Sequence, residues 1–165
     1  MLEQRPVIEL EKSAFQKIAD VIAILSVIAS IAYLIVKWSH LPETVATHFN
    51  LKSEPDGWGH KWMIVIPIII GGVIWVGMHF LEKIPQSYNY LWLTKENVQR
   101  QYKNAQLLVN AMKNFTLVFF SFTTFEFIRV SLGKKSLLGV WEMPVFLIVL
   151  FGTISYFVFQ SYRLR

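Results

Sequence analysis

Three histidines lie close together in one polar stretch of the chain, residues 37–61, together with three acidic residues. Imidazole and carboxylate groups are ordinary ligands of zinc. His40 and His48 are separated by seven residues, and His48 and His60 by eleven, which matches no local ligand pattern such as H-E-x-x-H. We therefore predict no metal site and no cofactor, and we keep His40, His48 and His60 as weak candidates for metal ligands.

The rest of the sequence contains no arrangement typical of an enzyme. The absence of cysteine excludes a thiol nucleophile and a cysteine-ligated metal. There is also no P-loop, no glycine-rich dinucleotide turn and no G-x-S-x-G nucleophile motif. These absences favour a non-enzymatic function. Two alternatives stay open: a membrane-bound, metal-dependent hydrolase that uses the histidines of residues 37–61, and an accessory subunit of a larger membrane complex.

The composition excludes an ordinary water-soluble domain. Hydrophobic residues make up 54% of the 165 residues and charged residues only 16%, whereas a typical globular chain has roughly 25% charged residues. A chain of this size has too little interior to bury so much apolar surface, so its surroundings must be lipid. In such a protein the net charge of +5 points to membrane orientation and lipid contact rather than to nucleic acid.

Four apolar segments are long enough to cross a bilayer, which takes roughly 20 helical residues. They are residues 18–36, 62–81, 114–132 and 143–160. Open strands cannot cross lipid, because their backbone groups would lack hydrogen-bond partners. The sequence therefore predicts an all-α integral membrane fold with four transmembrane helices, in a single polytopic domain that covers residues 1–165.

The third of these segments contains two charges, Glu126 and Arg129. Residues three apart on a helix lie on the same face and can pair. We therefore expect an intramembrane ion pair near the outer end of this helix, where charged groups can reach water.

Basic residues predict the orientation of the chain. The N-terminal tail, the loop of residues 82–113 and the C-terminal tail contain ten Lys and Arg residues, whereas the 37–61 loop and the region from Arg129 to Lys135 together contain six. Cytoplasmic loops carry the excess of Lys and Arg. We expect a multi-pass protein of the cell membrane with both termini and the 82–113 loop in the cytoplasm, and with the 37–61 loop outside.

The cytoplasmic loop is expected to contain a basic amphipathic helix. A helix that starts at Thr94 would run directly into the third span, with an apolar stripe that includes Val98, Tyr102 and Val109. Its basic residues make it a docking face for a cytoplasmic protein or a helix that packs at the inner surface.

The outer loop is expected to be held in shape by a turn at Pro55, Asp56 and Gly57. Pro fixes its own φ angle, Asp bonds its own backbone, and Gly tolerates a positive φ. Three tryptophans around the loop suit a membrane interface; they are Trp38, Trp58 and Trp62.

The same loop resembles a known family. The run His48-Phe49-Asn50, followed by Pro55-Asp56-Gly57-Trp58 and then by Lys61, resembles the H-F-N…G-x-P-D-G-[WY]-x-x-K signature of SdpI-like bacterial membrane proteins. The resemblance covers roughly residues 37–130. The sequence departs from the family at Ser53, which stands where the family has Gly.

The resemblance implies a function that composition alone does not suggest. The named member of the family is an immunity protein, which protects its producer from a secreted killing peptide and takes part in signalling through a soluble repressor. By this resemblance His48, Asn50 and Lys61 would contact a ligand, such as a secreted peptide, at the outer loop. The expected function is therefore resistance to a membrane-active peptide.

Overall fold

The computed structural model describes residues 5–50, 52 and 54–165, and within them the chain is mostly helical. Four α-helices and one β-hairpin are joined by short connections, several of which contain a turn of 3₁₀-helix. The elements are α1 (Ala14–Lys37), β1 (Thr44–Phe49), β2 (Pro55–His60), α2 (Ile66–Leu81), α3 (Val98–Ser131) and α4 (Glu142–Arg163).

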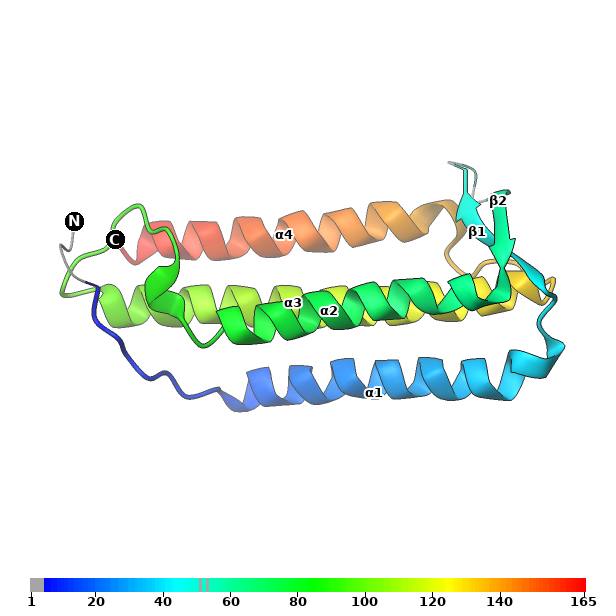
Figure 1. Cartoon of the computed structure of the whole chain (residues 1–165). Coiled ribbons are helices and arrows are strands. Elements are labelled where there is room, and N and C mark those ends of the chain that lie inside the picture. The colour runs from blue at the N-terminus through cyan, green and yellow to red at the C-terminus, as the bar shows by residue number, and fades with distance from the viewer. Residues whose placement is uncertain (1–4, 51, 53) are drawn as a thin grey trace.

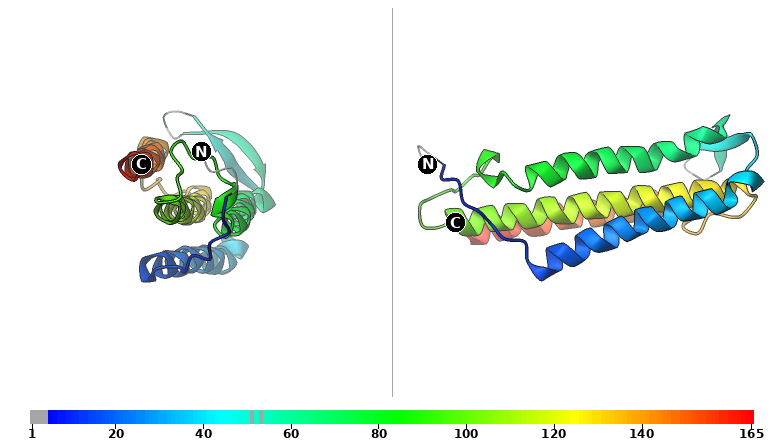
Figure 2. Two further views of the ribbon diagram at one scale, coloured as in Figure 1. Left: turned by 90° about the vertical axis from the view of Figure 1, so that its left-hand side faces the viewer. Right: turned by 60° about the horizontal axis from the view of Figure 1, so that its bottom comes forward.

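The helices form an elongated bundle around α3 (Figures 1 and 2). α1, α2 and α4 each pack against α3, whereas α2 and α4 do not pack extensively against each other. The first described residues and the C-terminus lie at one end of the bundle, and the hairpin lies at the other (Figure 1). We call these the terminal end and the hairpin end.

Three segments are long and apolar enough to cross a membrane: Ala14–His40, Lys61–Leu81 and Gly139–Arg163. Their large apolar side chains point outward, as at Ile28, Val73 and Phe151, each more than half exposed. Apolar patches of this extent are not stable in water. The three segments correspond to the expected spans 18–36, 62–81 and 143–160.

The expected span 114–132 lies within α3, which is one uninterrupted helix. This helix starts at Val98 and not at Thr94. The backbone N–H of Thr94 donates a hydrogen bond of 2.8 Å to the side chain of Asn97, so residues 94–97 form a turn that precedes the helix.

The buried face of α3 is polar, which corrects the expected apolar stripe. Val98 and Tyr102 are buried, but farther along the helix Val109 is only partly buried. The buried positions instead include several polar side chains on one helix face: Gln106, Asn110, Lys113, Asn114 and, two turns farther on, Ser121 and Thr124. When the surroundings are apolar, polar groups find their hydrogen-bond partners inside the bundle.

The hairpin corrects the expected turn at residues 55–57. Pro55, Asp56 and Gly57 lie in β2, and Gly57 pairs with His48 across the hairpin. The chain reverses instead at Asn50, whose side-chain oxygen accepts hydrogen bonds from the backbone N–H groups of Lys52 (2.8 Å) and residue 54 (3.1 Å). Asn side chains stabilise turns in this way.

Gly57 has no positive φ, so its backbone freedom does not explain its presence. A Cβ atom at this position would lie 2.8 Å from the Cβ of His48. The absence of a side chain therefore lets β2 approach β1 closely. Beneath the hairpin, Val45 packs in a small apolar core with Ile64 and Ile128, which attaches the hairpin to the bundle.

Candidate functional site

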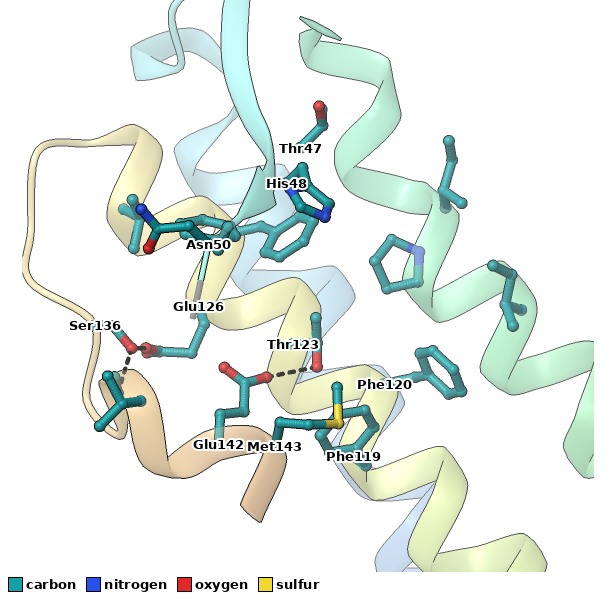
Figure 3. Close-up of a pocket in the computed structure, with 18 of the residues that line it drawn as sticks. Thr47, His48, Asn50, Phe119, Phe120, Thr123, Glu126, Ser136, Glu142 and Met143 are labelled. Atoms are coloured by element: carbon teal, nitrogen blue, oxygen red, sulfur yellow. Dashed lines mark hydrogen bonds between the residues drawn. The ribbon is translucent and has the colours of Figure 1, made fainter. Parts of the chain in front are cut away.

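A cavity of about 830 Å³ lies beneath the hairpin, between α2, α3 and α4 (Figure 3). We call it the outer pocket, because the hairpin belongs to the loop that the sequence predicts to lie outside. It exists because α2 and α4 both pack against α3 but leave a space between themselves. Residues of β1 lie above this space, and the pocket is open on one part of its surface.

Most of the pocket wall is apolar. Each of the three helices contributes residues, among them Ile66 and Ile70 of α2, Phe119 and Phe120 of α3, and Met143 and Leu147 of α4. The close approach of α2 to α3 depends on Gly71, where a Cβ atom would lie 2.7 Å from the Cβ of Phe120. A pocket of this size and character suits an apolar ligand.

Two carboxylates line the outer pocket. Glu126 is buried, and one of its oxygens accepts hydrogen bonds from the Ser136 hydroxyl (2.5 Å) and from the backbone N–H of Leu137 (2.7 Å). Its other oxygen lies 3.4 Å from Nε of Arg129, so the structure brings the expected pair together. Glu142, the first residue of α4, accepts a hydrogen bond of 2.8 Å from Thr123 (Figure 3).

The rim of the outer pocket contains two of the expected contact residues, His48 and Asn50. His48 is largely exposed, and its Nδ1 lies 2.5 Å from Oδ1 of Asp56. Asp56 therefore orients the imidazole. The sequence had suggested instead that Asp56 would bond the backbone of its own turn. Asn50 has its side-chain oxygen engaged in the hairpin turn, so its first role is structural.

The third expected contact residue, Lys61, lies outside the pocket wall. Its ammonium group donates a hydrogen bond of 2.6 Å to Glu43 and lies 5.2 Å from the ring centroid of Trp38. The hydrogen bond from Lys61 lowers the pKa of Glu43. These contacts join the two ends of the outer loop.

The three histidines of the outer loop have different neighbours. His48 pairs with Asp56, Nε2 of His60 lies 3.3 Å from Glu43, and the ring of His40 contacts Ser39. Within residues 5–50, 52 and 54–165, no three His, Asp or Glu side chains come together in a way that could hold a metal ion.

A second cluster of charged residues lies toward the terminal end, where α1, α2 and α3 meet. Nζ of Lys113 lies 2.5 Å from Glu82 and 3.0 Å from Asp20. Asn110 donates a hydrogen bond of 2.9 Å to each carboxylate, and Asn114 donates one of 2.8 Å to Asp20. The side chains of Lys113 and Glu82 are 0% and 1% exposed. We call this group the inner ion cluster.

The segment of residues 5–13 completes the inner ion cluster. Lys12 lies 2.6 Å from Asp20 and 3.1 Å from Glu82, so two cations face two carboxylates. Burial lowers the pKa of Lys12, but its hydrogen bonds to the two carboxylates outweigh burial and raise the pKa above its usual value. Ile8 packs against an apolar core at this end of the bundle.

The sequence interpretation missed this cluster. It counted Lys113 only among the basic residues of the 82–113 loop. The spacing of Asn110, Lys113 and Asn114 is the signal that could have revealed it, because residues three and four apart share one helix face. A polar face that leads into an apolar span must find partners inside the protein.

Comparison with known families matches residues 25–72 to a domain of unknown function (DUF1648). The matched stretch includes the C-terminal half of α1, the hairpin and the first part of α2. Neither the curated proteins nor the solved structures give a match.

Proposed function

We propose that this chain is a non-enzymatic protein of the bacterial cell membrane that binds an amphipathic ligand in the outer pocket. By binding the ligand, it would protect the cell from a membrane-active peptide. The observation that carries the proposal is the outer pocket itself. It has a volume of about 830 Å³, apolar walls from three helices and a few polar groups. This combination is typical of a ligand site.

The proposal includes α3 as a fourth transmembrane helix, so that residues 1–165 form one polytopic domain. α3 packs along α1, α2 and α4. Each of these three neighbours lies in a segment that is apolar enough to cross a membrane. A helix surrounded by membrane-spanning neighbours must lie at the same depth as they do. At about 1.5 Å per residue, its 34 residues are more than long enough to cross lipid.

We further propose that the hairpin end faces outward and the terminal end faces the cytoplasm. The excess of Lys and Arg in the tails and in residues 82–113 supports this orientation. Two aromatic residues near the hairpin end, Trp58 and Trp62, are well exposed, as expected for side chains at a membrane interface.

The choice of a peptide as the ligand rests on the resemblance to SdpI-like proteins. The residues that carry this resemblance include His48 and Asn50, which lie on the rim of the outer pocket. Two of its other residues, Asp56 and Gly57, hold His48 in place. The resemblance and the pocket thus concern the same part of the molecule.

The alternatives receive less support. A metal-dependent hydrolase needs ligands that converge, whereas the loop histidines are engaged with different residues. A cytoplasmic protein that docks on the basic face of residues 95–113 could not contact Lys113, which is buried. Lys103 is also engaged, because it donates hydrogen bonds to the backbone carbonyl of Glu11 and to the side-chain oxygen of Gln16. An interaction there would depend on Lys95 and Arg100.

The proposal can be tested by growth of a peptide-sensitive bacterial host that expresses the chain. We expect the chain to raise the inhibitory concentration of at least one membrane-active peptide. Ile70→Trp, which fills the outer pocket, should remove this protection. Ile69→Trp is the matched control, because Ile69 is exposed on the outside of the same helix and does not line the pocket. Equal protection by both variants, or no protection against any peptide, would contradict the proposal.

A further inference from the structure

We propose that the outer pocket selects ligands that carry a primary ammonium group on an apolar body, and that Glu142 is the counter-charge. This inference rests on the proposed function, since it names the chemistry of the ligand that the pocket would hold. A cationic amphipathic peptide, through a lysine side chain or its amino terminus, has this chemistry.

The argument starts from the charges that surround the pocket. Glu126 has a cation beside it, because Nε of Arg129 lies 3.4 Å away. Glu142 has no such partner: in the described part of the chain, no Lys, Arg or His forms an ion pair with it. With all three groups ionised, two carboxylates face one guanidinium, which leaves a net charge of −1 at the pocket.

The surroundings of Glu142 make this unpaired charge significant. Phe119, Met143 and Leu147 line the same pocket, and an ionised carboxylate among apolar groups is unfavourable unless it is paired. Glu142 begins α4, where the partial positive charge of the helix N-terminus favours the ionised form. The partial charge of the helix N-terminus is smaller than the charge of a full cation. A ligand cation would therefore stabilise the ionised carboxylate of Glu142 further.

The hydrogen-bonding groups fit an ammonium. Glu142 has one oxygen bonded to Thr123. On Glu126, the oxygen that faces Arg129 is buried and accepts no hydrogen bond from the described residues. An ammonium group has three N–H donors and no acceptor, so it can bond to the oxygen of Glu142 that Thr123 leaves free. The apolar body would then lie along Ile70 and Leu147, between α2 and α4.

The test uses the full-length protein in lipid nanodiscs at pH 7 and two probes of equal chain length, dodecylamine and dodecanol. Dodecylamine is protonated at this pH, whereas dodecanol is neutral. Thermal unfolding, followed by the fluorescence of the six tryptophans, gives the affinity of each probe, because a ligand of the folded state raises the unfolding temperature. We expect dodecylamine to bind at least tenfold more tightly than dodecanol.

The preference should disappear in Glu142→Gln, which should still bind dodecanol as the unmodified protein does. Glu96→Gln, which removes an exposed carboxylate outside the pocket, should keep the preference. Because the amine partitions into lipid equally in all samples, only a difference between variants counts.

The possible outcomes separate the two proposals. Equal affinity of both probes for the unmodified protein would overturn the ammonium preference and leave an apolar pocket in place. A preference that survives in Glu142→Gln would overturn the role of Glu142. If Ile70→Trp binds both probes as the unmodified protein does, then the outer pocket is not the binding site, and the proposed function fails as well.

Discussion

Lys113 on α3 and Glu82 at the end of α2 form an ion pair with a separation of 2.5 Å, and neither side chain is exposed to solvent. The same ammonium group lies 3.0 Å from Asp20 on α1. One lysine therefore connects three helices in the bundle. Removing one partner of a buried pair is far more destabilising than removing an exposed charge, because the remaining charge stays buried without compensation.

The first prediction concerns this lysine. Lys113→Met should lower the free energy of unfolding by about 3 kcal/mol or more, because two carboxylates would then share only Lys12. The measurement is a titration of the protein in mixed micelles with a denaturing detergent. Lys95→Met, at an exposed position in the turn before α3, should change the free energy by no more than about 0.5 kcal/mol. Equal effects of the two substitutions would contradict the cluster.

The second prediction concerns pH. Burial lowers the pKa of Lys12, but hydrogen bonds to Asp20 and Glu82 outweigh it, so the pKa in the folded protein lies above the usual 10.5. A raised pKa means that the stabilisation by Lys12 is fully present below pH 10.5 and is lost as the pH rises through the folded-state pKa.

The difference in unfolding temperature between the unmodified protein and Lys12→Met should therefore be constant from about pH 7 to pH 10 and shrink at higher pH. Comparing the two proteins cancels the titration of the other lysines and tyrosines. A difference that disappears below pH 9 would show that Lys12 is not held by the carboxylates.

The third prediction compares two adjacent glycines of α2. A Cβ atom at Gly71 would lie 2.7 Å from the Cβ of Phe120, whereas one at Gly72 would meet nothing within 4 Å. Gly71→Ala should therefore destabilise the protein by about 1–3 kcal/mol. Gly72→Ala should be neutral or slightly stabilising, because Ala favours the helix. Thermal unfolding of the two variants gives the comparison, and a reversed order would contradict the packing of α2 on α3.

Much of the fold could be predicted from the sequence, because long apolar segments must be helical in lipid. The polar face of α3 could not be predicted from an apolar stripe. The rule that an apolar stripe faces the protein core assumes water outside the protein. Lys113 illustrates the difference: it has the position expected of a basic loop residue, yet it is buried. Its partners, Asp20 and Glu82, are far away in the sequence and come together only through helix packing.

The outer loop shows a second limit. Asn50 and the Pro55-Asp56-Gly57 run are both typical of turns, and local chemistry does not decide between them. The choice depends on how β1 pairs with β2, which places Gly57 opposite His48. The pocket itself could not be predicted, because it depends on the space between α2 and α4.

The fourth prediction tests the orientation of the bundle. The chain has no cysteine, so a single introduced cysteine reports on one position. In Lys52→Cys, at the exposed tip of the hairpin, an impermeant thiol reagent should react in intact cells. In Arg163→Cys, near the end of α4, it should react only after the membrane is permeabilised. The opposite pattern would place the outer pocket on the cytoplasmic side.

The central claim is that the outer pocket binds a membrane-active peptide, and photo-crosslinking tests it most directly. A photoreactive phenylalanine derivative is placed at Met143, which lines the pocket, or at Ile148, which is exposed on the same helix and lies outside the pocket. The peptide is the one against which the chain gives the strongest protection. We predict that the peptide crosslinks to position 143 and not to position 148, and that Ile70→Trp abolishes the crosslink. Crosslinking at both positions to the same extent, or at neither, would contradict the claim.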